Sequence, residues 1–197
     1  MKQKSFIFIG RSGCGKGTQA KLLSDYLKKI DPNREILYVQ CGQEFREFIK
    51  GSSETQKLSK VIYDAGGLQP EFLAIYMWAN VLVNKFTKDE HVIMDGMPRK
   101  AHEAGALESV FDFYKLEKPV VINIDISKEQ SIDRLMARGR IDDNREDIAE
   151  RLSWYEIDVV PAIAFYENNP KYNFIKIDGN RPIEDVYKDI IEKANLK

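Results

Sequence analysis

The chain has 197 residues, 43% of them hydrophobic and 31% charged, which indicates one globular domain rather than a disordered or fibrous chain. With 30 basic and 31 acidic residues the net charge is −1, which argues against a nucleic acid or membrane surface held by bulk positive charge. Two cysteines and two histidines exclude a disulfide framework and a cysteine-rich zinc site, and no apolar run approaches the roughly 20 residues of a membrane span, so we expect a cytoplasmic protein.

Five short apolar runs predict the strands of a sheet. They are residues 6–9, 36–39, 91–95, 120–125 and 174–178. Runs that are apolar at nearly every position are typical of parallel strands, which helices cover on both faces. Longer helical patterns between the runs supply the crossovers that parallel strands need. The order of runs and helices therefore predicts an α/β fold with a parallel sheet.

The first and most regular helical pattern covers residues 16–29, with leucines and Ala20 along one side. A second covers residues 70–86 and begins at Pro70, because proline is favoured at the first helical position. A third pattern, 144–167, contains Pro161, which should kink or divide that helix.

The connection after the second strand is longer than a simple crossover. Residues 41–70 hold two short helical patterns, 42–50 and 54–65, followed by a turn at Gly66 and Gly67. We interpret this segment as a small helical insertion into the α/β core.

A glycine-rich loop follows the first predicted strand and leads into the first helix. It reads Gly10-Arg11-Ser12-Gly13-Cys14-Gly15-Lys16-Gly17-Thr18, the spacing of a phosphate-binding P-loop with Gly17 before the hydroxyl residue. Glycines let backbone N–H groups approach phosphate oxygens, and the helix N-terminus favours an anion. A plain glycine-rich turn with one lysine is the alternative. Cys14 is either a small filler or a thiol activated at the helix N-terminus.

Beyond this loop the sequence resembles the adenylate kinase family of nucleoside monophosphate kinases. The resemblance rests on several segments in family order, from Phe6 to Val186: Gly15-Lys16-Gly17-Thr18-Gln19-Ala20, Cys41-Gly42-Gln43-Glu44-Phe45-Arg46, Gly67-Leu68-Gln69-Pro70, Asp95-Gly96-Met97-Pro98-Arg99 and Gly139-Arg140-Ile141-Asp142-Asp143-Asn144. It implies a P-loop NTPase fold with a five-stranded parallel sheet, a helical nucleotide-binding insertion and a lid. The implied division of this single domain is a core of 1–40, 71–137 and 142–197, an acceptor-binding insertion of 41–70 and a lid of 138–141.

The resemblance implies magnesium-dependent transfer of the ATP γ-phosphoryl group to a nucleoside monophosphate, AMP by family precedent, in a monomer that binds nucleotides and no structural zinc. It implies a catalytic set of cations, whose planar arginine forks suit phosphates: Lys16, Arg99, Arg138, Arg140 and Arg151. It implies ATP contacts by Gly13, Cys14, Gly15, Lys16, Gly17, Thr18, Arg134, Arg138 and Gly179. Its acceptor contacts are Cys41, Gly42, Arg46, Gly67, Leu68, Gln69, Gly96, Met97, Pro98, Arg99, Glu103, Arg140 and Arg151.

Carboxylates near these arginines have several interpretations. Asp95 ends a predicted buried strand and is a candidate Mg²⁺ ligand, directly or through water, with Thr18 as a second candidate. A turn cap before Gly96 is the alternative for Asp95. Asp142 and Asp143 either orient the arginines, touch the ATP ribose or cap the helix that begins near Asn144.

Three departures from the family pattern affect the expected chemistry. Only Gly139 separates Arg138 from Arg140, which indicates a stub lid that shields phosphates less well from water. Cys41 replaces a threonine hydroxyl beside the acceptor base. Glu103 replaces a base-reading glutamine; an ionised carboxylate there would favour GMP or a relaxed acceptor, unless Glu103 is a surface helix residue.

Two other functions compete with a nucleoside monophosphate kinase. A different P-loop kinase, acting on a sugar or an acid, is disfavoured by the two acceptor-side cations Arg46 and Arg99. A nucleotide sensor without turnover is disfavoured by the number of cations, because a binder has little use for groups that stabilise a transition state.

Overall fold

The computed structural model describes residues 1–139 and 144–196. Five parallel strands form one sheet in the order β2-β3-β1-β4-β5. The strands are β1 Ser5–Ile9, β2 Ile36–Gln40, β3 His91–Asp95, β4 Val120–Asp125 and β5 Asn173–Asp178. The prediction of a five-stranded parallel sheet is therefore confirmed. Each predicted run begins and ends within one residue of the observed strand.

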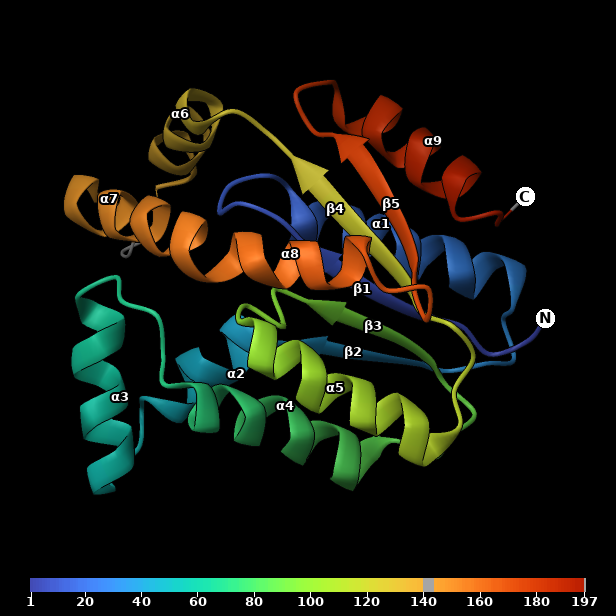
Figure 1. The fold of residues 1–197 in the computed structure, drawn as a ribbon, viewed down its shortest axis with the longest axis horizontal. Coiled ribbons are helices and arrows are strands. Elements are labelled where there is room, and N and C mark those ends of the chain that lie inside the picture. The colour runs from blue at the N-terminus through green and yellow to red at the C-terminus, as the bar shows by residue number, and fades with distance from the viewer. Residues whose placement is uncertain (140–143, 197) are drawn as a thin grey trace.

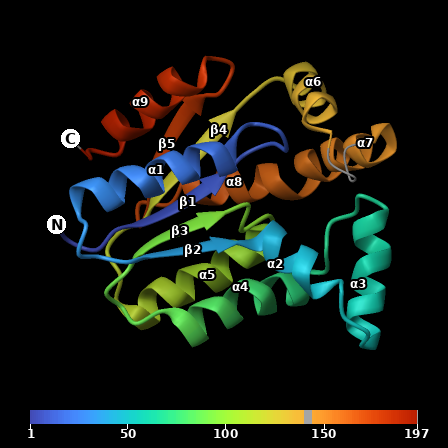
Figure 2. The same cartoon turned by 180° about the vertical axis from the view of Figure 1, so that it is seen from behind.

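Helices lie on both faces of the sheet. They are α1 Lys16–Ile30, α2 Cys41–Phe48, α3 Glu54–Asp64, α4 Glu71–Lys85, α5 Ala101–Tyr114, α6 Lys128–Arg138, α7 Arg145–Trp154, α8 Val160–Glu167 and α9 Ile183–Lys193. Figure 1 shows α4, α5 and α8 in front of the sheet, and Figure 2 shows α1 and α9 on the opposite face. No helix in the ranges 1–139 and 144–196 has the length and apolar character needed to cross a membrane.

The alternation of side chains along β1 divides the core into two layers. Phe6 and Phe8 pack with α1 and α9, whereas Ile7 and Ile9 pack with the helices of the other face. Both sets are fully or almost fully buried. Burial on both faces explains why β1 is apolar at nearly every position.

Two predicted helix boundaries need correction. Pro70 does not open the helix: its extended ψ of 141° makes it the cap, and α4 begins at Glu71. The long pattern 144–167 is divided, as expected, but not by Pro161 alone. A π-helical turn, Tyr155–Val159, separates α7 from α8, and Pro161 lies in the first turn of α8, where no intrahelical N–H is needed.

The segment interpreted as an insertion contains α2 and α3 and the loop to α4. A capping box begins α3, in which Ser53 and Gln56 satisfy each other's backbone N–H groups. α3 stands apart from the sheet in both views (Figures 1 and 2). The backbone carbonyl of Gly66, in the loop after α3, accepts a hydrogen bond from the indole N–H of Trp154 at 3.2 Å, so the insertion touches α7.

Candidate active site

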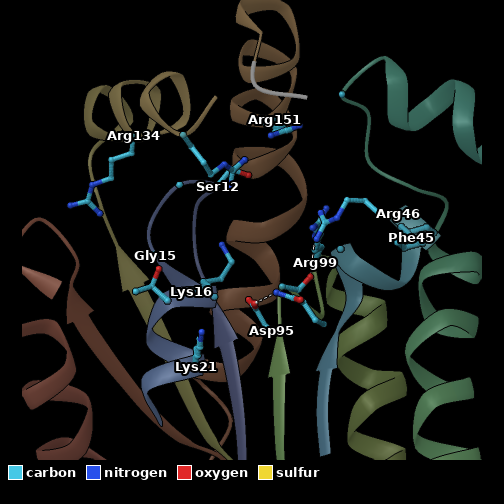
Figure 3. Close-up of a pocket in the computed structure, with 18 of the residues that line it drawn as sticks. Ser12, Gly15, Lys16, Lys21, Phe45, Arg46, Asp95, Arg99, Arg134 and Arg151 are labelled. Atoms are coloured by element: carbon cyan, nitrogen blue, oxygen red, sulfur yellow. Dashed lines mark hydrogen bonds between the residues drawn. The ribbon is translucent and has the colours of Figure 1, made fainter. Parts of the chain in front are cut away.

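A cleft of about 880 Å³ opens at the carboxyl ends of β1, β2 and β3. This is the edge at which open parallel sheets bind ligands. Charged groups from six different elements or loops face it, among them Lys16, Arg46, Asp95, Arg99, Arg134, Arg138 and Arg151. Figure 3 shows Arg46 and Arg99 on one side of the space, Lys16 and Arg134 on the other, and Arg151 above. An excess of cations of this kind suits a polyphosphate ligand.

The glycine-rich loop has the backbone that its sequence predicts. Gly10 and Gly15 have φ angles of 141° and 97°, which a side chain rarely permits. A Cβ on Gly10 would lie 2.4 Å from the carbonyl oxygen of Ile124. Cys14 is buried and packs in the apolar cluster beneath the loop, which favours the filler interpretation over an activated thiol.

Lys16 bridges the loop from inside. Its ammonium group donates to the carbonyl oxygens of Gly10 at 2.7 Å and Arg11 at 2.9 Å. The side chain therefore lies where the loop closes around a ligand, with its charge next to the backbone that would face phosphate oxygens.

Asp95 ends β3 next to the loop. Its Oδ2 accepts hydrogen bonds from the Tyr38 hydroxyl at 3.0 Å and from the Gln40 amide at 3.3 Å, and none of the described groups donates to Oδ1. Burial and the nearby Asp95 charge raise the pKa of Tyr38 well above its usual value, so Tyr38 remains a donor. A Cβ on Gly17 would lie 3.3 Å from Asp95, so the absence of a side chain there leaves room for the carboxylate.

Two residues expected at the ATP base lie together. Arg134 donates to the carbonyl of Gly179 at 2.8 Å. Gly179 leaves no room for a side chain, because a Cβ would lie 2.6 Å from Ile124 and 2.7 Å from Ile126. The Ser131 hydroxyl donates to the Ser12 carbonyl at 2.7 Å and so fixes α6 to the phosphate loop.

The two arginines that we expect on the acceptor side, Arg46 and Arg99, also line the cleft. Arg46 donates through Nε and Nη2 to the Gln43 side chain at 3.1 and 2.9 Å. Arg99 donates to the Gly96 carbonyl at 3.1 Å, and its guanidinium carbon lies 5.3 Å from the centre of the Trp154 ring. Gly42, Gly67, Gln69 and Gly96 line the cleft beside them.

Other predicted acceptor residues lie behind this lining. Cys41, Leu68, Met97, Pro98 and Glu103 do not border the cleft, although Pro98 borders a smaller cavity between Lys16 and Trp154. The Gln69 amide group already forms two hydrogen bonds with Ser59 of α3: it accepts one from the Ser59 hydroxyl and donates one to the Ser59 carbonyl. Burial raises the pKa of the Cys41 thiol to about 11, so Cys41 is a neutral group.

The interpretation of Glu103 as a surface helix residue is wrong. Its side chain is 2% exposed and lies in the first turn of α5, where one carboxylate oxygen accepts from the Arg99 backbone N–H at 3.3 Å. Burial is the largest influence on its pKa and raises it above the usual range, and Glu71 adds to this effect. The expectation of a freely ionised carboxylate at this position needs correction, because burial favours the neutral acid.

The described residues do not include 140–143. The expectations for Arg140, Asp142, Asp143 and the part of the expected lid 138–141 that follows Gly139 therefore lie outside them. Gly139 itself ends α6 in the left-handed conformation, with a φ of 63°. The cap of α7 is Asn144, whose side chain accepts from the Asp147 N–H at 2.8 Å. Arg145, for which the sequence indicated no role, is exposed on the first turn of α7.

Several cleft residues were not expected from the sequence: Ser12, Lys21, Leu22, Asp25, Gln40, Phe45, Tyr63 and Trp154. Helical spacing could have indicated some of them, for example Lys21 and Trp154. Lys21 lies three residues after Thr18 on α1, and Trp154 lies three residues after Arg151 on α7, so each shares a face with a predicted site residue.

Comparison with known proteins connects this cleft to one family. The model of the adenylate kinase family matches residues 8–171. The chain is 33% identical over 183 residues to adenylate kinase 1 of Synechocystis, covering 93% of this chain and 92% of that protein. It is 32% identical over 191 residues to the adenylate kinase of Phocaeicola vulgatus, with 95% and 96% covered. With the adenylate kinase of Corynebacterium urealyticum the identity is 31% over 180 residues, with 91% and 93% covered.

Proposed function

This chain belongs to the adenylate kinase family and is a phosphotransferase, and we propose that the cleft described above is the site at which it transfers the ATP γ-phosphoryl group to AMP. The observation that carries this proposal is the convergence of Lys16, Arg46 and Arg99 on one cleft. Phosphoryl transfer needs little covalent chemistry from the protein, because positioning and charge stabilisation supply most of the rate. A cleft rich in fixed cations suits such a reaction, which needs no nucleophilic side chain from the protein.

On the ATP side, the phosphate loop from Gly13 to Thr18 would hold the phosphates through backbone N–H groups. Lys16 would neutralise the β- and γ-phosphates as a point charge. Arg134 and Gly179, joined by their hydrogen bond, would lie against the base, and Arg138 would reach the phosphates. Arg140 has the same proposed role from its sequence motif alone.

On the acceptor side, Arg46 and Arg99 would hold the AMP phosphate from two directions. Their planar guanidinium groups favour bidentate phosphate contacts. Arg151 lies on α7 above both halves of the cleft and would stabilise the phosphoryl group during transfer (Figure 3). These three arginines would place the acceptor oxygen in line with the γ-phosphorus, which is the geometric condition for rapid transfer.

The donor set near Asp95 fits Mg²⁺. That ion keeps several waters and binds nucleotide enzymes through one or two carboxylates together with the phosphates. Among residues 1–139 and 144–196 no three acidic, cysteine or histidine side chains form a cage, and Mg²⁺ needs none. Asp95 would hold it, directly or through water, with the Thr18 hydroxyl as a second oxygen. When bound, the ion would neutralise charge on the ATP phosphates.

A neutral Glu103 is compatible with AMP as acceptor. Adenine presents an acceptor at N1 and a donor at its amino group. A protonated carboxyl group can donate to the first and accept from the second, as an amide does. The burial that raises the Glu103 pKa favours this form. Neither GMP as acceptor nor a sugar or acid substrate gains support, because the relatives named above are adenylate kinases.

Formation of ADP from ATP and a panel of nucleoside monophosphates tests the proposal. We expect AMP to be the preferred acceptor and two molecules of ADP to form for each ATP consumed. ADP formation that does not depend on any monophosphate would overturn it. The same would follow from a clear preference for an acceptor other than AMP.

A further inference from the structure

Arg11 belongs to the phosphate loop but does not line the cleft. Its side chain points away from the loop towards the π turn between α7 and α8. The guanidinium carbon lies 4.1 Å from the centre of the Tyr155 ring, and Nη2 donates to Glu156 at 2.8 Å. This side chain is only 12% exposed. Arg11 therefore packs against the π turn instead of facing the cleft, which gives it a task other than binding phosphates.

The π turn places adjacent side chains on different neighbours. Trp154 and Tyr155 are both buried although they are consecutive on a helix. Trp154 faces the acceptor side, where its indole N–H donates to Gly66 and its ring lies under the Arg99 guanidinium. Tyr155 faces the phosphate loop through Arg11. Consecutive residues point about 100° apart around a helix, so the two rings reach different neighbours at the start of the π turn, and such turns are frequent at functional sites.

Two groups compensate the charge of the Arg11 guanidinium. Its Nε and Nη1 atoms are buried without a hydrogen-bond partner among the described residues, so the Tyr155 ring and the Glu156 carboxylate are the groups that compensate the charge. A cation on an aromatic face that is shielded from water gains more than an exposed one. Loss of the Glu156 charge would leave the guanidinium partly uncompensated.

We propose that Trp154, Tyr155 and Glu156 form a positioning junction that holds both halves of the active site on one helical turn. Arg11 is the positioning residue for the phosphate loop, and therefore for ATP. Trp154 is the positioning residue for Gly66 and Arg99, and therefore for the acceptor. The assignment of the two halves to ATP and AMP rests on the proposed function above.

Two variants test this junction, because each should weaken the binding of only one of the two substrates. Arg11→Met keeps an unbranched stem that can lie on the ring but removes the charge. Trp154→Phe keeps a ring but removes the N–H donor to Gly66. We expect Arg11→Met to raise the KM and Kd for ATP about three- to thirtyfold and to leave those for AMP within about twofold of wild type. Trp154→Phe should raise the KM and Kd for AMP by a similar factor and leave those for ATP within about twofold. Arg11→Lys, which keeps a cation on the ring, should recover part of the ATP affinity.

Arg34→Met is the matched control. Arg34 is 20% exposed and pairs with Asp31 and Asp89, between α1 and β2 at the other end of the sheet. We expect it to lower the unfolding midpoint without changing either KM. If Arg11→Met changes the KM and Kd for ATP and for AMP equally, or changes none of them, the proposed junction is wrong. Equilibrium binding separates the two proposals: Arg11→Met would still weaken ATP binding if wild-type protein bound ATP but formed no ADP from AMP.

Discussion

Burial, more than any charged neighbour, raises the pKa of Glu103 above its usual range. The groups around it come from four elements or loops: Glu71 of α4, Cys41 of α2, Tyr166 of α8, and Arg99 and Lys100 before α5. Glu71 raises the Glu103 pKa, whereas Arg99 and Lys100 lower it, and burial outweighs them. We propose that Glu103 reads adenine, and because adenine needs a donor opposite N1, AMP binding would then require the neutral form of Glu103.

The use of AMP should therefore depend on pH. As the pH rises through the raised pKa of Glu103, the carboxyl group loses the proton that it would donate to adenine. The KM for AMP should therefore increase with pH, by about 5- to 150-fold for one lost hydrogen bond, while the KM for ATP changes little. Steady-state kinetics between pH 5 and 9 would measure it.

Glu103→Gln is the matched variant, because an amide keeps a donor at every pH. Its KM for AMP should be flat over the same range and close to the wild-type value at low pH. If the wild-type profile is already flat, or if the variant retains the dependence, Glu103 does not read the base.

At the level of helices and strands, patterns with a local physical cause could be predicted. The five strands follow from apolar runs, and the phosphate loop follows from glycines before a helix. The π turn could not be predicted, since an extra residue in a helix leaves no mark on a sequence that is helical on both sides. The burial of Glu103 and the contact of Trp154 with Gly66 depend on how α5, α7 and the insertion pack together.

Packing of the loop after α3 against α7 constrains Gly66 closely. It has a φ of 67°, and a Cβ there would lie 2.7 Å from the Asp147 Cα of α7. We expect Gly66→Ala to reduce the free energy of unfolding by about 2 kcal/mol or more, from the left-handed backbone and the clash together. Urea unfolding followed by circular dichroism would measure this.

Gly105→Ala is the control for that substitution. Gly105 is exposed in the middle of α5, and a Cβ there would have no heavy atom within 4 Å. Alanine should stabilise the helix by about 0.5–1 kcal/mol. Equal stability of the two variants would show that Gly66 is not constrained by α7.

At the scale of the whole molecule, we propose that segment 41–70 is the part that moves. Arg46 in this segment is half-buried and is held by Gln43 on its own helix, and α3 stands apart from the sheet (Figure 1). We expect segment 41–70 to approach the core when AMP binds, with Arg46 exchanging Gln43 for the phosphate. Spin labels on Leu58→Cys and Lys188→Cys, both exposed positions, would report a shorter distance with AMP. An unchanged distance distribution would contradict this expectation.

We propose that the cleft around the phosphate loop performs the transfer, and Lys16→Met tests this role most directly. Lys29→Met, at an exposed position in the last turn of α1, is the control. We predict that AMP-dependent ADP formation falls at least about a hundredfold in Lys16→Met, with an unchanged unfolding midpoint, and stays at the wild-type rate in Lys29→Met. A folded Lys16→Met protein that turns over within about tenfold of wild type would contradict the account.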